Sequence, residues 1–187
     1  MARQYTAKAG NYLVFLSSYD YLQKLATLFS ARYPSIPMWE QTRRMDETAR
    51  DEFLARFTLH GQGIGFAVLG GVFAEGIDLP GKRLIGAFIA TLGLPQVNPV
   101  NEQIRARMGA NFSAGQSYDY TYLYPGLQKV VQAAGRVIRT TSDQGVIYLI
   151  DDRFTRPEVH DLLPRWWRVN RLRVRRNDSA LARWVED

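Results

Sequence analysis

Three polar side chains, Gln132, Arg136 and Arg139, recur four and three residues apart within a short apolar segment of this 187-residue chain. In a helix, that spacing places all three side chains on one face. Arginine stays protonated, and its planar guanidinium group can donate two parallel hydrogen bonds to a phosphate. The row therefore suits a polyanion held at an interface. A salt-bridged surface helix is the alternative that these residue types leave open.

Residues 76–83 (GIDLPGKR) match a phosphate-binding loop, G-x-x-x-x-G-K, at every position but the last. That motif requires Ser or Thr at its end, because the hydroxyl ligates magnesium, and this chain has Arg83 there. Pro80 also removes a backbone N–H that could have faced phosphate. An apolar run typical of a strand follows, where the motif needs the start of a helix. We therefore predict that this segment is not a P-loop.

Residues 146–152 (VIYLIDD) mimic a strand that presents a magnesium-binding aspartate in P-loop ATPases. Without a P-loop upstream, Asp151 and Asp152 are instead expected to cap the next turn or to pair with Arg153. The glycine-rich residues 61–65 lead into a predicted strand and not out of one, which argues against a dinucleotide-binding loop.

The sequence offers neither a pattern of metal ligands nor a thiol. His60 and His160 have no companions at the spacing of metal ligands. The chain has no cysteine, which excludes a disulfide, a thiolate zinc site and an iron–sulfur cluster within it.

Short apolar runs separated by helical patterns predict an α/β protein with a mostly parallel sheet flanked by helices on both faces. In such sheets, ligands bind in the loops that follow the carboxyl ends of the strands. Strands are predicted at residues 11–16, near 36–39, at 65–69, 84–91 and 146–150. Helices are predicted after Ser18, at about 46–57, near 101–108, at 122–140 and at about 179–187, with the rest of residues 92–118 as a loop.

Positive charge is concentrated near the end of the chain. The net charge is +6, and residues 165–176 hold six arginines and no acid, so the remainder is neutral. This basic tail suits a phosphate backbone or an acidic partner, and a solvated edge strand is the alternative. Trp166 and Trp167 beside it favour packing at a core edge over stacking on bases. No apolar run approaches the ~20 residues that span a bilayer, so we expect a cytoplasmic protein with no membrane partner.

Three segments resemble signature motifs of the DinG/XPD-like group of superfamily 2 DNA helicases. Residues 132–145, which begin QAAGRVIR, are similar to motif VI, and residues 70–81 (GGVFAEGIDLPG) are similar to motif V. Residues 12–19 (YLVFLSSY) are similar to motif IV. The motifs occur in the family's order, with Tyr-Pro-Gly at 124–126 before motif VI, and the resemblance covers roughly residues 10–155. It implies a single RecA-like domain, the second motor domain of a helicase, over residues 1–187.

The resemblance also implies a nucleotide site shared between two domains. In this family, ATP and Mg²⁺ bind mainly to a first domain that carries the P-loop and, when present, the iron–sulfur cluster. This chain contains no such domain, so we expect it to hydrolyse no ATP alone. By similarity, Arg136 and Arg139 are the catalytic arginines that reach the triphosphate, and Gln132 helps to set the interface. The other ATP-binding residues implied are Glu75, Gly76 and Asp78.

The resemblance further implies contacts with single-stranded DNA, and the N-terminal helicase domain of the same protein as a partner. Small and hydroxyl-bearing residues contact phosphates without reading bases, so binding is expected to be sequence-tolerant and salt-sensitive. A non-catalytic nucleic-acid-binding α/β module derived from a helicase is the alternative function. The residues that match the DNA path are Ser17, Ser18, Tyr19, Gly71 and Phe73.

Overall fold

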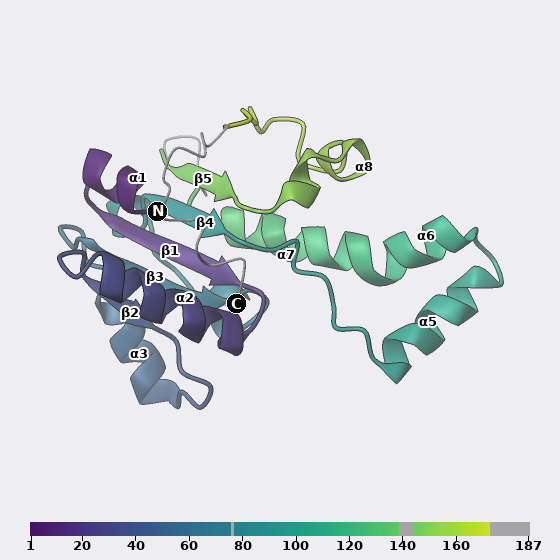
Figure 1. The fold of residues 1–187 in the computed structure, drawn as a ribbon, viewed down its shortest axis with the longest axis horizontal. Coiled ribbons are helices and arrows are strands. Elements are labelled where there is room, and N and C mark those ends of the chain that lie inside the picture. Colours follow the sequence, from purple (N-terminus) through teal and green to yellow (C-terminus); the bar gives the residue numbers. More distant parts are fainter. Residues whose placement is uncertain (76, 139–143, 173–187) are drawn as a thin grey trace.

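The computed structural model describes residues 1–75, 77–138 and 144–172. Its centre is a five-stranded, all-parallel sheet with helices on both faces (Figure 1), which confirms the predicted fold class. The strands lie in the order β2-β3-β1-β4-β5, so the first strand in the chain is the middle of the sheet. They are β1 (Asn11–Leu16), β2 (Met38–Glu40), β3 (Gly63–Val68), β4 (Gly86–Ile89) and β5 (Val146–Leu149).

Strand β1 is buried on both faces, which explains its continuous apolar sequence. Tyr12 lies opposite Ile64 of β3 and Gly86 of β4. Successive side chains of a strand point to opposite faces. Leu13 and Phe15 accordingly join one hydrophobic core, while Tyr12, Val14 and Leu16 join the other.

Each core is closed by its own helices. Helices α1 (Ala2–Ala7) and α2 (Tyr19–Arg32) cover the face of Tyr12, and α3 (Glu47–Ala55), α4 (Val72–Glu75) and α7 (Tyr124–Ala134) cover the face of Leu13. Helix α1 was not predicted, because it is short and buries no residue fully. The remaining short elements are η1 (Gly81–Arg83), η3 (Asp152–Thr155) and α8 (Pro157–His160).

An arm of helices extends away from the sheet between β4 and α7 (Figure 1). It consists of α5 (Pro99–Gly109), α6 (Ala114–Tyr118) and a single wide turn, η2 (Asp119–Leu123). The sequence predicted α5 but not α6, which begins at a capping box made by Ser113 and Gln116. In η2, the N–H of Tyr124 donates to the carbonyl of Asp119, five residues back. The next residue is Pro125, which has no N–H to continue an α-helical pattern.

The end of the chain is described only in part. Trp167 packs against the core of Leu13, as expected, whereas Trp166 is 67% exposed. The described part of the basic tail, residues 165–172, forms no strand. The rest of that tail and the predicted terminal helix at 179–187 lie outside the described residues. Within the described ranges, no helix combines the length and apolar character needed to cross a membrane.

Candidate functional site

A hydrogen-bonded network joins the carboxyl ends of β1, β2 and β3. Gln41, directly after β2, is only 5% exposed. Its side-chain amide donates to the Tyr19 hydroxyl at 2.8 Å and accepts from the N–H of Val68 at 2.9 Å. Ser18 begins α2 by accepting from the N–H of Tyr21 at 3.2 Å, which fixes the backbone beside Tyr19. Three of the residues assigned to the DNA path, Ser17, Ser18 and Tyr19, thus lie together where β1 passes into α2, beside a glutamine that the sequence did not single out.

Cationic side chains surround this network. The Arg43 guanidinium lies over the Tyr19 ring at 5.6 Å from its centroid and forms an ion pair with Asp20. On the other side, the half-buried Lys129 side chain passes the turn after β3, because a Cβ built on Gly70 would lie 3.1 Å from its Cδ. Gly71 adjoins the same network, since a Cβ there would lie 3.7 Å from Gln41 Nε2. Residues 41–44 (QTRR) directly follow a predicted strand, so the strand-end rule could have found Gln41 and Arg43.

Phe73 does not belong to that surface. Its side chain is 0% exposed, and its ring packs against Phe53 with centroids 4.3 Å apart. The prediction that Phe73 lines the DNA path is therefore wrong for its ring, which is part of the core. Helix α4 turns this side chain toward Phe53 of α3.

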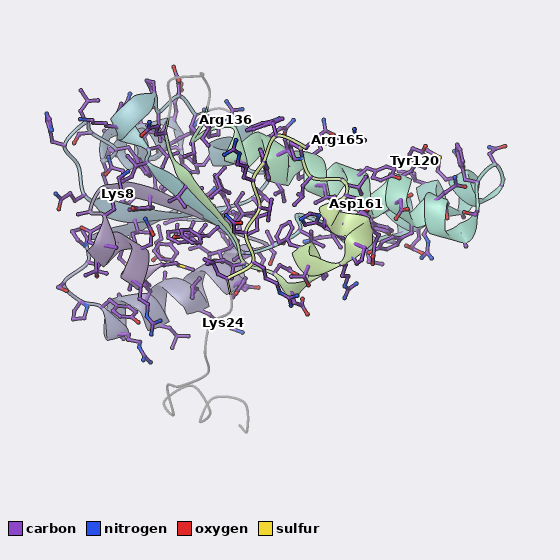
Figure 2. All side chains as sticks on the ribbon, turned by 90° about the horizontal axis from the view of Figure 1, so that it is seen from above. Lys8, Lys24, Tyr120, Arg136, Asp161 and Arg165 are labelled. Atoms are coloured by element: carbon purple, nitrogen blue, oxygen red, sulfur yellow. The ribbon has the colours of Figure 1, made fainter. Side chains whose placement is uncertain are left out.

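Arg136 lies in a turn and not on the regular helix expected there. Helix α7 ends at Ala134, and the N–H of Arg136 donates to the carbonyl of Ala133 at 3.1 Å. The prediction of one helical stripe is therefore wrong for Gln132 and Arg136, because the helix ends between them, and its third member, Arg139, lies outside the described residues. Gln132 is exposed on the last turn of α7, and Figure 2 shows Arg136 at the end of that helix away from the arm.

The structure brings Arg136 against the motif V segment. Its Nη1 atom donates to the carbonyl of Ile77 at 3.4 Å, and the residue as a whole is half-buried. Ile77 and Leu79 are both 2% exposed, while Asp78 between them is exposed. Two predicted nucleotide-binding residues, Arg136 and Asp78, thus lie on adjoining segments.

Gly76 and Arg139 lie outside the described residues, and Glu75 is described only as the last residue of α4.

The two predicted binding faces lie at opposite ends of the sheet. Tyr19, Gln41 and Gly71 follow the carboxyl ends of their strands. By contrast, a Cβ on Gly145, just before β5, would lie 2.3 Å from Cγ1 of Val137 and 3.2 Å from the carbonyl of Ile85. The turn that holds Arg136 therefore reaches the amino ends of β4 and β5. The rule that ligands bind after the carboxyl ends of the strands predicts only the first of these two faces.

The two sequence mimics have structural roles. The segment before β4 forms η1, and Arg83 Nε donates to the carbonyl of Phe57 at 2.8 Å, so the mismatched position of the P-loop pattern holds a loop in place. Asp151 caps η3 and pairs with Arg153 at 2.6 Å, as predicted. The Arg153 guanidinium lowers the pKa of the Asp151 carboxyl below its usual range.

A model of the helicase C-terminal domain family matches residues 1–170. The chain belongs to this family. Similar proteins include the ATP-dependent DNA helicase chl-1 of Caenorhabditis elegans, 27% identical over 82% of this chain and 19% of the relative. A probable ATP-dependent helicase of Methanocaldococcus jannaschii is 31% identical over 78% of this chain and 24% of the relative. This helicase C-terminal domain therefore spans about a fifth to a quarter of the length of those relatives.

Solved structures show the same fold. A structure titled "XPD_APO" matches 85% of this helicase C-terminal domain with a TM-score of 0.67 and 19% identity, and the match covers 32% of that chain. A second, titled "XPD_Helicase", gives a TM-score of 0.65 with 21% identity over 85% of this domain and 28% of that chain. Together with the relatives, these matches confirm that the domain is of the DinG/XPD-like type.

Proposed function

We propose that this helicase C-terminal domain is the second motor lobe of an ATP-dependent DNA helicase, which completes a nucleotide site whose P-loop lies on another lobe. Arg136 and Arg139 contact the triphosphate, with Asp78, Glu75, Gly76 and Gln132 around them. ATP and Mg²⁺ are bound mainly by the other lobe. The domain alone hydrolyses no ATP.

The observation that carries this proposal is the contact between Arg136 and the Ile77 carbonyl. It places a protonated guanidinium on the segment that resembles motif V, so residues 59 positions apart in the chain meet on one surface. Phosphoryl transfer builds negative charge on the γ-phosphate, and a guanidinium stabilises that charge without changing its own protonation state. Because Arg136 is half-buried and not enclosed, a triphosphate on a facing lobe can reach it.

The opposite end of the sheet serves the nucleic acid in this proposal. Tyr19 can stack on a base, and the backbone and hydroxyl groups of Ser17 and Ser18 can contact phosphates. Arg43 and Lys129 add positive charge beside them. None of these groups reads a base edge, so single-stranded DNA binding is expected to tolerate sequence and weaken with salt.

The test uses the domain joined to, or mixed with, the P-loop lobe of its own helicase. Arg136→Ala is expected to lower ATP turnover about 10³-fold or more, because a catalytic arginine contributes 10³–10⁵ in related NTPases. Arg32→Ala is the matched control, since Arg32 is exposed at the end of α2, on the other face of the sheet. Circular dichroism checks that each variant is folded.

Two results would overturn the proposal. One is retained ATP turnover in Arg136→Ala, which would show that Arg136 is not a catalytic arginine. The other is ATP turnover by the 187-residue chain alone, which would show that the ATP site is not shared with another lobe. If the complete assembly binds single-stranded DNA but shows no ATPase activity, the non-catalytic module derived from a helicase is the correct function.

A further inference from the structure

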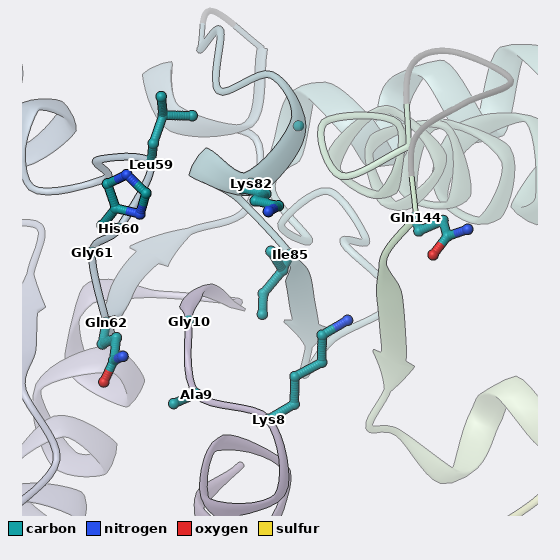
Figure 3. Close-up of a pocket in the computed structure, with 11 residues that line it drawn as sticks. Lys8, Ala9, Gly10, Leu59, His60, Gly61, Gln62, Lys82, Ile85 and Gln144 are labelled. Atoms are coloured by element: carbon teal, nitrogen blue, oxygen red, sulfur yellow. The ribbon is translucent and has the colours of Figure 1, made fainter.

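A hollow of about 530 Å³ lies over the amino ends of four adjacent strands (Figure 3). Its walls are the short segments that directly precede β1, β3, β4 and β5. This volume is within the range of small-molecule sites, about 300–1,000 Å³. We call it the amino-end basin. Its polar lining residues are Lys8, His60, Gln62, Lys82 and Gln144.

The basin is positively charged. Two lysines line it, and none of its lining residues within the described ranges is an aspartate or a glutamate. Among the described residues, neither Lys8 nor Lys82 forms an ion pair with a carboxylate. Figure 3 shows the two side chains on either side of Ile85, in the space between the walls. Two lysines that line one hollow, with no acid among its described lining residues, favour an anionic ligand.

The backbone of Lys8 is held in place. Its carbonyl accepts a hydrogen bond from the hydroxyl of Tyr12 at 2.7 Å, and Tyr12 is 0% exposed. The same hydroxyl accepts from Gln4 Nε2 at 3.3 Å, and Gln4 Oε1 accepts from the Tyr148 hydroxyl at 2.6 Å. Strands β1 and β5 therefore fix the loop that carries Lys8.

The backbone of Lys82 is held on the opposite wall. Gly81 before it has a φ of 58°, a left-handed conformation that favours glycine. Arg83 after it is tied to the Phe57 carbonyl at 2.8 Å. Hydrogen bonds to other segments therefore hold the backbone at or next to each lysine.

We propose that the amino-end basin binds the phosphate groups of a nucleoside di- or triphosphate, with Lys8 and Lys82 as the cationic contacts. Lysine binds phosphate as a point charge, and the amides of Gln62 and Gln144 can donate to further phosphate oxygens. Leu59 and Ile85 supply apolar surface for a sugar or base. This lining suits a nucleotide better than free phosphate.

The position of the basin favours a nucleotide over a DNA strand. Lys82 is five residues after Ile77, whose carbonyl contacts Arg136, so the chain separates the two by at most about 18 Å. The network of Tyr19 and Gln41 lies at the other end of the sheet. The lining of the basin is by itself the argument that it binds phosphate anions. The argument that the bound anion is a nucleotide rests on the proposed function.

The experiment titrates the 187-residue chain with ADP, with sodium tripolyphosphate and with a dT oligonucleotide, by calorimetry at low salt. ADP and tripolyphosphate are expected to bind the unaltered chain, and Lys8→Ala or Lys82→Ala to weaken each about tenfold. Lys8→Arg, which keeps the charge, restores most of the binding. Lys24→Ala is the matched control, because Lys24 is an exposed lysine on α2 and does not line the basin (Figure 2).

Equal binding by all variants, or no binding of ADP and tripolyphosphate to the unaltered chain, would overturn the proposal. Oligonucleotide binding that depends on Lys8 and Lys82, without ADP binding, would overturn its assignment to nucleotide. The ATPase test of Arg136→Ala is independent of these titrations. If the basin binds no ligand, the proposal of a shared ATP site is unaffected. If Arg136→Ala keeps its ATP turnover, the proposal for the basin is still decided by the titrations.

Discussion

The side chain of Gln41 contributes both to the stability of the domain and to the proposed site for single-stranded DNA. Both ends of its amide are bonded, one to a backbone N–H and the other to a side chain that faces the proposed DNA path. Such a residue acts through its neighbour: it holds the Tyr19 hydroxyl and does not itself need to touch the ligand. Its burial explains why residue type alone did not reveal it, since glutamine is usually exposed.

Gln41→Ala is expected to destabilise the domain by about 1–3 kcal/mol, because the part-buried N–H of Val68 loses its acceptor. The same change frees Tyr19, and affinity for single-stranded dT is expected to fall several-fold. Chemical denaturation and fluorescence anisotropy measure the two effects. Gln23→Ala, at an exposed position on α2, is the control for both. Unchanged stability would mean that the Val68 N–H is satisfied in another way.

Asp151 offers a test that depends on pH. Arg153 lowers the pKa of its carboxyl, so the folded state favours the ionised form. The resulting stabilisation is present above the unfolded pKa of about 4 and is lost as pH falls through the lower folded pKa. Asp151→Asn can keep the cap on η3 while removing the charge.

At pH 7, Asp151→Asn is expected to lower the free energy of unfolding by on the order of 1 kcal/mol, since the Arg153 partner is partly exposed. The difference from the unaltered chain shrinks as pH falls below about 4. Urea denaturation at a series of pH values measures it. A difference that stays constant down to the lowest pH would show that the charge contributes nothing.

At the scale of elements, one glycine in β3 makes room for aromatic rings. A Cβ on Gly65 would lie 2.7 Å from Cζ of Phe57 and 3.1 Å from Cζ of Phe53. These rings pack around Trp39, so none can move without displacing another. On the arm, by contrast, a Cβ on Gly115 would have no atom within 4 Å.

The same substitution is therefore expected to have opposite effects at these two glycines. Gly65→Ala overpacks the core and lowers stability by about 1–3 kcal/mol. Gly115→Ala, within helix α6, raises it by up to about 1 kcal/mol because alanine favours the helix. Thermal and urea unfolding of the two variants provide the comparison. A stable Gly65→Ala variant would mean that the aromatic cluster rearranges.

The sequence predicted elements better than it predicted their ends. All five strands were predicted near their observed places. Apolar runs located β1, β3 and β4, because a strand buried on both faces must be apolar throughout. The end of α7 was misplaced, since Arg136 fits a helical pattern whether or not the helix continues to it. Phe73 was assigned to a surface for a related reason: a motif match gives the segment but not the direction of a side chain. Arg136 and Ile77 meet only through tertiary packing, which no local pattern encodes.

At the scale of the whole molecule, the sheet separates two faces that a motor must couple. Tyr19 and Gln41 lie at its carboxyl end, whereas the turn of Arg136 reaches its amino end. The segment after β3 runs from one to the other, since Gly71 adjoins Gln41 and the Ile77 carbonyl contacts Arg136, so coupling within this domain would pass along that segment or through the packed core. In a two-lobe motor, closure around a triphosphate can instead move the domain as one body, which carries both faces together.

The isolated domain is therefore expected to treat the two faces as independent. Arg43→Ala should reduce the slope of log affinity for dT against log salt by about 0.7, the loss of one phosphate contact on a single strand. Arg136→Ala should leave both affinity and slope unchanged, and the double variant should match Arg43→Ala within about 0.5 kcal/mol, as additivity requires for distant sites. Arg32→Ala is the control, because Arg32 also lies over a tyrosine, Tyr33, at 6.0 Å. If Arg136→Ala alone weakens DNA binding in the isolated domain, the two faces are coupled within the domain, and movement of the domain as one body does not account for all of the coupling.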